Sequence, residues 1–261
     1  MWLDKGKYAR TLLICGIAVL SMVSGCANLS SHAAGTPDSL EPINRSIYDF
    51  NDYLDRKIAK PVADAYVRIT HENIRLTVSN FFDNIRYFNV ILNDVLQGKG
   101  QQGLSDMSRF LMNSTVGTGG LFDVASEFGL EAQEEDFGQT LGVWGAGEGG
   151  YLVLPFLGPS SFRDAPNLLV STFTNGLFYV GVTAVTFPLA VLAAIDQRAR
   201  SDQAINFRDQ AAVEPYVFTR EAYLEHRRYL IYDGSPPLDD VFFEENFDNG
   251  EDDQPSPPGS Q

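Results

Sequence analysis

Three histidines supply the imidazole groups that a hydrolase could use in this chain: His32, His71 and His226. His32 lies in a segment of small residues, whereas His71 and His226 lie in helical patterns beside charged neighbours. The run from Gly158 to Phe162 contains two serines but lacks the second glycine of a nucleophile elbow. A serine hydrolase needs its serine and histidine in a defined arrangement. We therefore interpret both helical histidines as surface residues, and we predict no catalytic residues and no enzyme activity.

Two further segments could bind ligands by their composition. The run Gly117-Thr118-Gly119-Gly120 is rich in glycine, but it lacks the Lys-Ser/Thr pair of a phosphate-binding loop. The four acidic residues between Glu131 and Asp136 lack the glycine and the spacing of a calcium loop. We interpret the first segment as a turn and the second as a solvated patch. We predict neither a metal nor a cofactor.

Cys26 lies where a lipid anchor would be attached. A basic stretch is followed by an uncharged and mostly apolar run from Thr11 to Met22, and then by Val23-Ser24-Gly25-Cys26. This order is typical of an export signal, and its end resembles the lipobox, in which the cysteine is acylated and becomes the new N-terminus. We expect residues 1–25 to be removed; an ordinary secretory signal with Cys26 as a free thiol is the alternative. Ala27 stands where an aspartate would retain a lipoprotein on the inner membrane, which favours the outer membrane.

The charge balance excludes several classes of partner. The chain has 34 acidic and 19 basic residues, a net charge of −15, and removal of residues 1–25 would make it more negative. Nucleic acids and anionic lipid headgroups are bound through clustered basic side chains. Membrane contact is therefore expected to come from acyl chains and apolar surface. Of the two cysteines, Cys15 lies in the signal and Cys26 in the lipobox, so we expect no disulfide bond.

Apolar spacing predicts an all-α fold in a single domain over residues 38–232, after a flexible tether over 26–37. From Pro42 onward, apolar residues recur every three or four positions, the period of an amphipathic helix. Pro61 is expected to end this helix and begin the next. Further helical patterns cover residues 74–95, 104–111 and 216–232. The glycine-rich stretch 117–150 is predicted to be loop with short helical pieces, and residues 233–261, acidic and rich in proline, a disordered tail.

Residues 165–195 form an apolar segment without a charged residue, and its second half is long enough in principle to span a bilayer. Pro188 interrupts this half, and Gly176 and Gly181 weaken it, so we expect a broken hairpin of two short helices lying in one leaflet. A buried hairpin in the core of a soluble protein is the alternative. The residues expected to contact the membrane are Leu177, Phe178, Val182, Val185, Phe187, Leu189 and Leu192.

Short polar and aromatic motifs follow one another along most of the chain, from about Asp38 to about Asp233. They include Leu40-Glu41-Pro42-Ile43-Asn44-Arg45, Phe50-Asn51, Lys60-Pro61-Val62, Ser79-Asn80-Phe81-Phe82, Leu96-Gln97-Gly98, Arg109-Phe110-Leu111-Met112-Asn113-Ser114, Gly119-Gly120-Leu121-Phe122-Asp123, Glu135-Asp136-Phe137-Gly138-Gln139-Thr140-Leu141-Gly142-Val143-Trp144, Tyr151-Leu152-Val153-Leu154-Pro155, Leu157-Gly158-Pro159-Ser160, Arg163-Asp164 and Arg220-Glu221-Ala222-Tyr223. In content and order these motifs resemble the VacJ/MlaA family of outer-membrane lipoproteins.

The resemblance implies a ring-shaped helical protein in the inner leaflet of the outer membrane, facing the periplasm, with an amphipathic channel through the ring. It also implies that phospholipids misplaced in the outer leaflet are removed and passed to a periplasmic carrier, MlaC, and that trimeric porins are partners. Because a headgroup crossing hydrocarbon needs polar contacts, we place the channel candidates on the first helix and on the segment after Gly150. These candidates are Phe50, Asn51, Tyr151, Leu154 and Pro155.

Two other functions stay open at the level of the sequence. A structural lipoprotein could brace porins or the envelope without moving lipid, although an uncharged hairpin is more than a brace needs. A phospholipid hydrolase at the same membrane would need a serine or histidine whose replacement stops lipid cleavage.

We predict that Cys26→Ser abolishes lipidation, because Cys26 carries the thiol that is left once residues 1–25 are removed. Metabolic labelling with a fatty-acid analogue should mark the parent protein and leave the variant unmarked and mislocalised. Label that persists on the Ser variant would contradict the assignment of the anchor.

Overall fold

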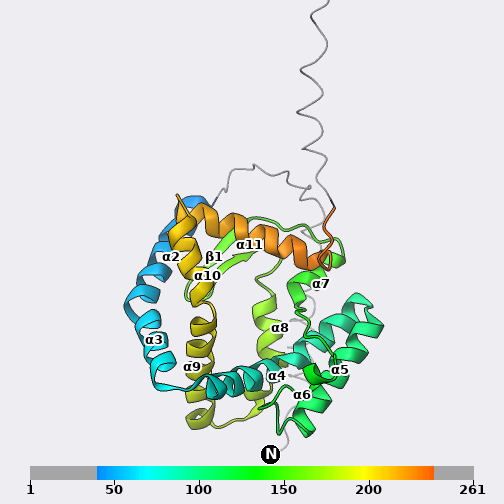
Figure 1. The fold of residues 1–261 in the computed structure, drawn as a ribbon. Helices are drawn as coiled ribbons and strands as arrows, with labels where there is room; N and C mark the ends of the chain where they lie inside the picture. The colour runs from blue at the N-terminus through cyan, green and yellow to red at the C-terminus, as the bar shows by residue number, and fades with distance from the viewer. Residues whose placement is uncertain (1–39, 238–261) are drawn as a thin grey trace, which may run out of the picture.

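The computed structural model describes residues 40–237. The predicted signal, Cys26, the tether and all but the first residues of the acidic tail lie outside the described residues. The described part is mainly helical (Figure 1). Its helices are α2 (Glu41–Leu54), η1 (Asp55–Ala59), α3 (Lys60–Ile69), α4 (Glu72–Gln97), α5 (Gly100–Thr115), α6 (Val124–Glu127), α7 (Phe137–Val143), α8 (Asn167–Thr174), η2 (Gly176–Tyr179), α9 (Thr183–Arg200), α10 (Asp202–Ala211) and α11 (Pro215–Ile231). Two short strands, β1 (Tyr151–Leu154) and β2 (Gly158–Ser161), form an antiparallel hairpin.

The helices follow one another in a ring (Figure 1). Helices α2 and α3 form one side, α4 crosses the base, α7 and α8 form the other side, and α11 crosses the top. Helix α9 packs along α3 and against α4, and α5 with α6 forms a lobe outside the ring beside α4. The predicted all-helical, ring-shaped fold is confirmed, with the small β-hairpin as an addition that periodicity did not reveal.

Pro61 does not end a helix, contrary to the prediction from sequence. Residues 41–69 form one continuous helical column, in which the five-residue π-turn η1 connects α2 to α3. The Lys60 amide donates to the Asp55 carbonyl, five residues back, so the chain widens by one residue immediately before the proline. Pro61 lies in the first turn of α3, immediately after this π-turn, and the helical column continues past it without a break.

The predicted break in the apolar segment is confirmed, but it does not fall at Pro188. Helix α8 ends at Thr174, and a 3₁₀ turn and an extended stretch lead to Thr183, where α9 begins and continues through Pro188 to Arg200. Asn175 leaves helical geometry and its side chain accepts the Leu177 amide, which ends α8 and caps the 3₁₀ turn. Among residues 40–237, no helix combines the length and the apolar character that crossing a membrane requires.

The β-hairpin is attached to α2 by two asparagine side chains. Asn44 donates to the Tyr151 carbonyl and accepts the Val153 amide, both at 2.9 Å. Asn51 repeats this pattern with the Leu154 carbonyl at 2.9 Å and the Phe156 amide at 2.8 Å. Seven residues of helix rise about 10.5 Å, and three residues of strand advance about 10 Å, so the two side chains match the repeat of the strand edge. We call Asn44 and Asn51 the asparagine pair.

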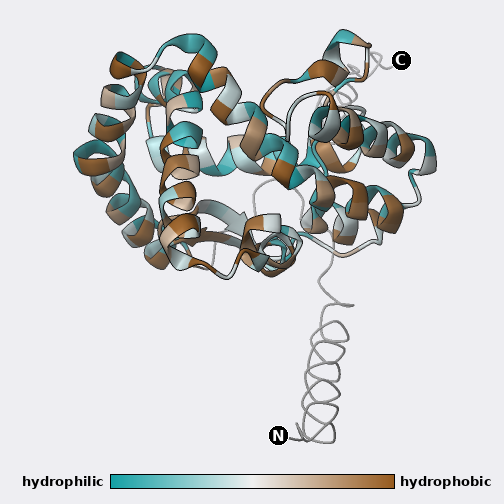
Figure 2. Ribbon diagram, turned by 90° about the horizontal axis from the view of Figure 1, so that it is seen from below, coloured by the Kyte–Doolittle hydropathy of each residue, from teal (hydrophilic) through white to brown (hydrophobic). Residues whose placement is uncertain are grey.

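The buried interior of the described chain contains more polar than apolar residues. The apolar core cluster is small: Tyr151, Val153 and Tyr216 are buried, with Ile47, Tyr48, Val217, Tyr223 and Leu224 packed against them. Many large apolar side chains are exposed instead, and hydrophobic residues recur on all sides of the ring in Figure 2. Within residues 40–237, many apolar side chains therefore do not contribute the stabilisation that burial from water would give.

We predict that Asn44→Ala lowers the free energy of unfolding by about 2–4 kcal/mol, because two buried backbone groups of β1 lose their partner. The measurement is denaturant unfolding of the detergent-solubilised protein. Ser46→Ala is the matched control, since this exposed serine donates to the Pro42 carbonyl of its own helix. Equal stability of the two variants would show that the asparagine pair does not hold the hairpin.

Candidate functional site

The apolar segment presents its side chains outward. Of the residues predicted to contact the membrane, Phe178, Val182, Val185 and Phe187 are exposed. Leu177, Leu189 and Leu192 are half-buried. The surrounding residues Leu168, Leu169, Phe173, Tyr179, Val180 and Val191 are exposed as well. The alternative of a hairpin buried in the core is thus wrong for the exposed residues of this segment, while Leu177, Leu189 and Leu192 pack in part against the described chain.

The aromatic residues at the turn of this segment support one another. Phe173 and Phe178 meet edge to face with ring centroids 5.4 Å apart, and Phe178 meets Tyr179 in the same way at 5.4 Å. The Tyr179 hydroxyl donates to the Phe173 carbonyl at 2.7 Å, so its polar atom is satisfied within the turn. The turn therefore offers an aromatic surface without an unpaired hydroxyl on Tyr179.

The α2–η1–α3 column adds a second exposed apolar surface. Its members lie along one side of the ring: Ile43, Phe50, Tyr53, Ile58, Val62, Val67 and Ile69. The apolar stripe that predicts the first helix is therefore real, but Ile43, Phe50 and Ile58 are exposed rather than packed in a core. The residue of α2 that is buried is Asn44.

The five channel candidates come together where α2 meets the β-hairpin. Asn51 is bonded to the Leu154 carbonyl, and the Phe50 ring meets the Phe156 ring edge to face at 5.5 Å. Tyr151, in contrast, is buried in the core cluster between Tyr216 and Tyr223. Leu154 is half-buried and Pro155 is exposed. Phe50, Leu154 and Pro155 thus have accessible surface. Asn51 and Tyr151 instead attach the β-hairpin to α2 and to the core cluster.

Phe156 was not among the candidates, and it lies at the tip of the β-hairpin. Its φ of 65° is in the left-handed region, which a large side chain rarely adopts. Pro155 precedes it and the Leu157 amide bonds back to the Leu154 carbonyl, so Phe156 occupies the turn position that glycine or asparagine usually fills. The bond from its amide to Asn51 and the Phe50 contact hold it there, with 78% of its surface exposed.

A buried arginine closes the top of the ring. The Arg227 guanidinium on α11 donates to both carboxylate oxygens of Asp136, at 2.6 and 2.9 Å, and to those of Asp164, at 3.0 and 3.1 Å. Burial opposes ionisation of Asp164, but Arg227 and Arg163 outweigh it and lower the pKa of this carboxyl. Asp136 also caps α7 by accepting the Gln139 amide. One side chain therefore joins α11, α7 and the loop after β2.

A second arginine fixes the loop between α5 and α6. Arg109 is buried and bonds to Asp123, Ser126 and the Leu130 carbonyl. Asn113 donates to the same aspartate at 2.9 Å and accepts the Ala125 amide at 2.9 Å. The Gly117-to-Gly120 run between these contacts is a turn, as predicted; Gly120 has a φ of 88° and an added Cβ would lie 2.5 Å from Asn84.

Two buried carboxyl groups face each other between α4 and α5. Asp94 and Asp106 are fully buried, and Gly103 lets the helices approach, since a Cβ there would lie 3.2 Å from the Asp94 Cβ. Asp94 Oδ1 accepts from Gln102 at 2.9 Å, but among the described residues Asp94 Oδ2 and both Asp106 oxygens lack a donor. Burial, and next the Asp106 carboxyl, raises the pKa of Asp94 to about 7, and burial also raises that of Asp106. The pair therefore shares a proton.

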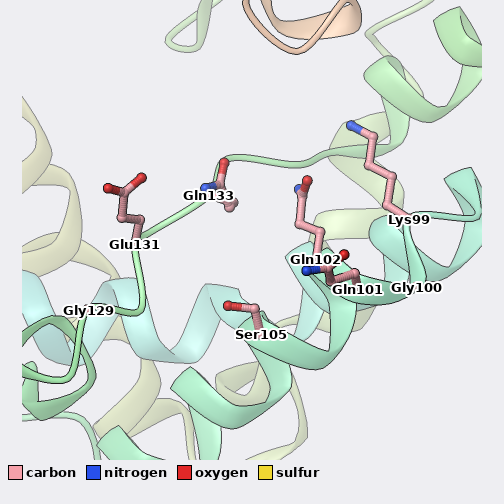
Figure 3. A pocket seen from close by; sticks show the side chains of 8 residues that line it. All are labelled: Lys99, Gly100, Gln101, Gln102, Ser105, Gly129, Glu131 and Gln133. Carbon is pink, nitrogen blue, oxygen red and sulfur yellow. The ribbon is translucent and has the colours of Figure 1, made fainter.

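A cavity of about 610 Å³ lies between the start of α5 and the loop after α6, and Gln102, which donates to Asp94, is one of its lining residues (Figure 3). Its lining is polar or glycine: Lys99, Gly100, Gln101, Gln102, Ser105, Gly129, Glu131 and Gln133. Lys99 is already paired with Glu135 at 2.8 Å and with Asp233. This cavity offers no apolar wall for an acyl chain, so it is not where lipid tails would be held.

The MlaA lipoprotein family model matches residues 36–230. The chain belongs to the MlaA lipoprotein family. An Escherichia coli (strain K12) relative, the intermembrane phospholipid transport system lipoprotein MlaA, is 33% identical over 222 residues, which cover 82% of this chain and 86% of the relative. A Haemophilus influenzae protein with the same description is 28% identical over 240 residues, 88% of this chain and 92% of its own.

One solved structure is similar to the ring. It is described as the structural basis for maintenance of bacterial outer membrane lipid asymmetry, and it aligns with a TM-score of 0.66 and 31% sequence identity. The alignment covers 75% of this chain and all of the solved chain. The similarity thus extends over the whole of that MlaA-like fold.

The motifs that resemble the MlaA family include many of the polar contacts described above. Asn44, Asn51, Arg109, Asp136 and Asp164 all belong to them. The partners of these residues were not found from sequence, and neither was the carboxyl pair. The burial of Asp94 could have been suspected from sequence, because this acid interrupts the apolar series 91–95. Arg227 lies among other charged residues of its helix, so the sequence gives no sign that it is buried.

We predict that the carboxyl pair makes stability fall as pH rises. An unfolded aspartate releases its proton near its ordinary pKa of 3.8, whereas folded Asp94 keeps it to about 7. The stabilisation is therefore fully present below about pH 4 and is lost as pH rises through 7. Between about pH 5 and 8 the parent should lose about 2 kcal/mol more unfolding free energy than Asp94→Asn, which mimics the protonated acid.

Asp83→Asn is the control for this measurement. Asp83 lies on the same helix but is half-exposed and paired with Arg86 and Arg200. This variant should keep the pH dependence of the parent. If Asp94→Asn also keeps it, no proton is shared between the two carboxyl groups.

Proposed function

We propose that this chain is an outer-membrane lipoprotein that takes misplaced phospholipids from the outer leaflet and passes them to a periplasmic lipid carrier. The proposal transfers to this chain what the descriptions of its relatives say, namely intermembrane phospholipid transport and maintenance of outer-membrane lipid asymmetry. The periplasmic carrier and a trimeric porin are the protein partners that the family resemblance suggests. They belong to the proposal.

The observation that carries the proposal is the outward-facing apolar surface of α8, η2 and α9. This surface comes from a segment of 31 residues, 165–195, without a charge. Exposed apolar area of this extent is unfavourable in water and favourable in hydrocarbon. A hairpin too short to cross the bilayer would lie in one leaflet, beside the acyl chains expected on Cys26.

The physical task is to move a polar headgroup past hydrocarbon. This step costs several kcal/mol when the headgroup has no polar contacts. A ring whose outer residues are apolar and whose inner contacts are polar lowers that barrier without covalent chemistry. We place the lipid path beside the asparagine pair, where Phe50, Leu154 and Pro155 offer accessible apolar surface. Phe156 extends this surface at the tip of the hairpin.

The direction of transfer is assigned to the acceptor. Lipid transfer along a wall of fixed side chains proceeds towards whichever membrane or carrier binds the lipid more tightly. We propose that the periplasmic carrier supplies this difference. Phospholipid that co-purifies with the protein in mild detergent, identified by mass spectrometry, would support a path through this chain, and a brace without transport would carry none.

A hydrolase is disfavoured by where the two histidines lie. His71 caps α4, with its Nδ1 accepting the Asn73 amide at 3.3 Å. His226 is exposed on α11, while its neighbour Arg227 is the buried member of that turn. The His71 imidazole thus caps a helix, and the His226 imidazole is exposed to solvent.

The test compares charge placed on two exposed valines. Val185 lies on the apolar hairpin, and Val213 lies fully exposed between α10 and α11. Val185→Asp should cost about 2–3 kcal/mol in lipid and raise the outer-leaflet phospholipid accessible to an external phospholipase. Val213→Asp, and alanine at His71 and His226, should leave this level at that of the parent.

Three outcomes would contradict the proposal. Equal effects of Val185→Asp and Val213→Asp would mean that the hairpin is not in lipid. A strong defect from His71→Ala or His226→Ala, at normal protein abundance, would favour the enzyme. Normal lipid asymmetry in cells that lack the protein altogether would favour the structural brace.

A further inference from the structure

Helix α9 changes character at Asp196. Its first thirteen residues, 183–195, carry no charge, and their outer side chains are exposed. The next seven residues contain four charged side chains: Asp196, Arg198, Arg200 and, just after the helix, Asp202. The connection between α8 and α9 lies below α4 in Figure 1, so the start of α9 projects beyond the base of the ring.

Asp196 is the buried residue of α9, with 1% of its surface exposed. Its Oδ1 accepts from the Tyr66 hydroxyl of α3 at 3.2 Å and from the Ser79 hydroxyl of α4 at 3.1 Å. Its Oδ2 accepts from Ser79 at 2.9 Å and is paired with Arg200 at 3.2 Å. One carboxylate thus joins three helices, and Arg200 continues from it to Asp83 on α4 at 2.9 Å.

Arg198 holds the opposite face of α9. Two residues along a helix correspond to about 200° of rotation, so Arg198 and Asp196 point to opposite sides. Its guanidinium pairs with both carboxylate oxygens of Asp55, in the π-turn η1, and with Asp202 at 3.1 Å. Asp202 in turn is paired with Lys60 at the start of α3. Contacts on both faces therefore restrain the rotation of α9, and Asp196 supplies the buried one.

We propose that Asp196 is a positioning residue that sets the rotation of α9, and through it which side chains of the apolar hairpin face lipid. Leu192, Leu189 and Val185 lie on the same helix face as Asp196, at steps of four, three and four residues. Phe187 and Val191 lie on the opposite face. This inference rests on the proposed function, because it takes the hairpin to be in a membrane.

The carboxylate is suited to this task because it is buried and fully engaged. Hydrogen bonds to a charged acceptor are stronger and more directional than neutral ones. Apolar contacts between α9 and α3 would tolerate a rotation by one ridge, since they are not directional. A carboxylate bonded to hydroxyls from two different helices does not tolerate such a rotation, because its hydrogen bonds would break. Loss of Asp196 should therefore turn the hairpin without melting the ring.

The test follows the two faces of α9 separately. A spin label is attached at Val185→Cys or at Phe187→Cys, two exposed positions about 200° apart. The full-length protein is reconstituted in phosphatidylethanolamine and phosphatidylglycerol vesicles. Collision with oxygen, which partitions into lipid, and with a water-soluble nickel chelate reports the depth of each label. The variants are Asp196→Leu, the milder pair Tyr66→Phe with Ser79→Ala, and Asp196→Asn.

We expect Asp196→Leu to move the two labels in opposite directions, one towards lipid and the other away, by at least a factor of two in the ratio of collision rates. The Tyr66→Phe and Ser79→Ala double variant should give a smaller shift of the same sign. It tests the same contacts if the Asp196→Leu variant does not fold. Asp196→Asn should restore most of the parent pattern, because its amide oxygen still accepts from both hydroxyls. Asp209→Asn, which alters an exposed ion pair with Arg56 and Arg208, is the matched control without effect.

The outcomes separate this inference from the proposed function. Labels in lipid that do not respond to any Asp196, Tyr66 or Ser79 variant would overturn the positioning role and leave the membrane location intact. Labels that move together towards water would indicate general unfolding and also overturn it. Labels outside lipid in the parent protein would contradict the proposed function itself.

Discussion

The ring depends on hydrogen bonds and ion pairs buried between its helices, several of which expose large apolar side chains. Arg227 joins α11 to α7 and to the loop after β2, Asp196 joins α9 to α3 and α4, and the asparagine pair joins α2 to the β-hairpin. Helices in hydrocarbon gain little from burying apolar surface against each other, so packing and polar contacts must hold them together. Under the proposed membrane location, the polar interior follows from the apolar side chains outside, and each of these contacts leaves a buried group unpaired when one partner is removed.

The same constraint divides the molecule along its charge pattern. The segment 165–195 has no charge, and the ion pairs of α9 begin immediately after it. The projecting hairpin can thus enter lipid without burying a charge, while the ring beneath it keeps a fixed geometry. In the proposed function, this arrangement keeps the path for a headgroup at a constant place relative to the membrane. Contacts on a mobile loop would not keep it there.

Particular residues show how far sequence patterns reach. Spacing located several of the long helices: the end of α4 falls at Gly98, whose φ of 77° explains why glycine is needed there, and the last helix was found almost to the residue, whereas α10 was not predicted. Pro188 was misread, since it lies inside α9 and the helix continues through it, and a π-turn before Pro61 joins α3 to α2 without a break. The β-hairpin was missed because its four-residue strands are stabilised by asparagine side chains 100 residues away along the chain.

By itself, the sequence determined the export signal and lipobox pattern, the uncharged segment, the helical periodicity and the family resemblance, since each of these is a local property of neighbouring residues. Only the tertiary structure decided which way the amphipathic faces turn. The stripe of α2 could have been packed in a core or left exposed, and the burial of Asn44 beside exposed Ile43 and Phe50 shows that it is exposed. The partners of Asp94, Asp196 and Arg227 were likewise decided by packing between distant helices, because a charged residue in a helix carries no local sign of the group that it will meet.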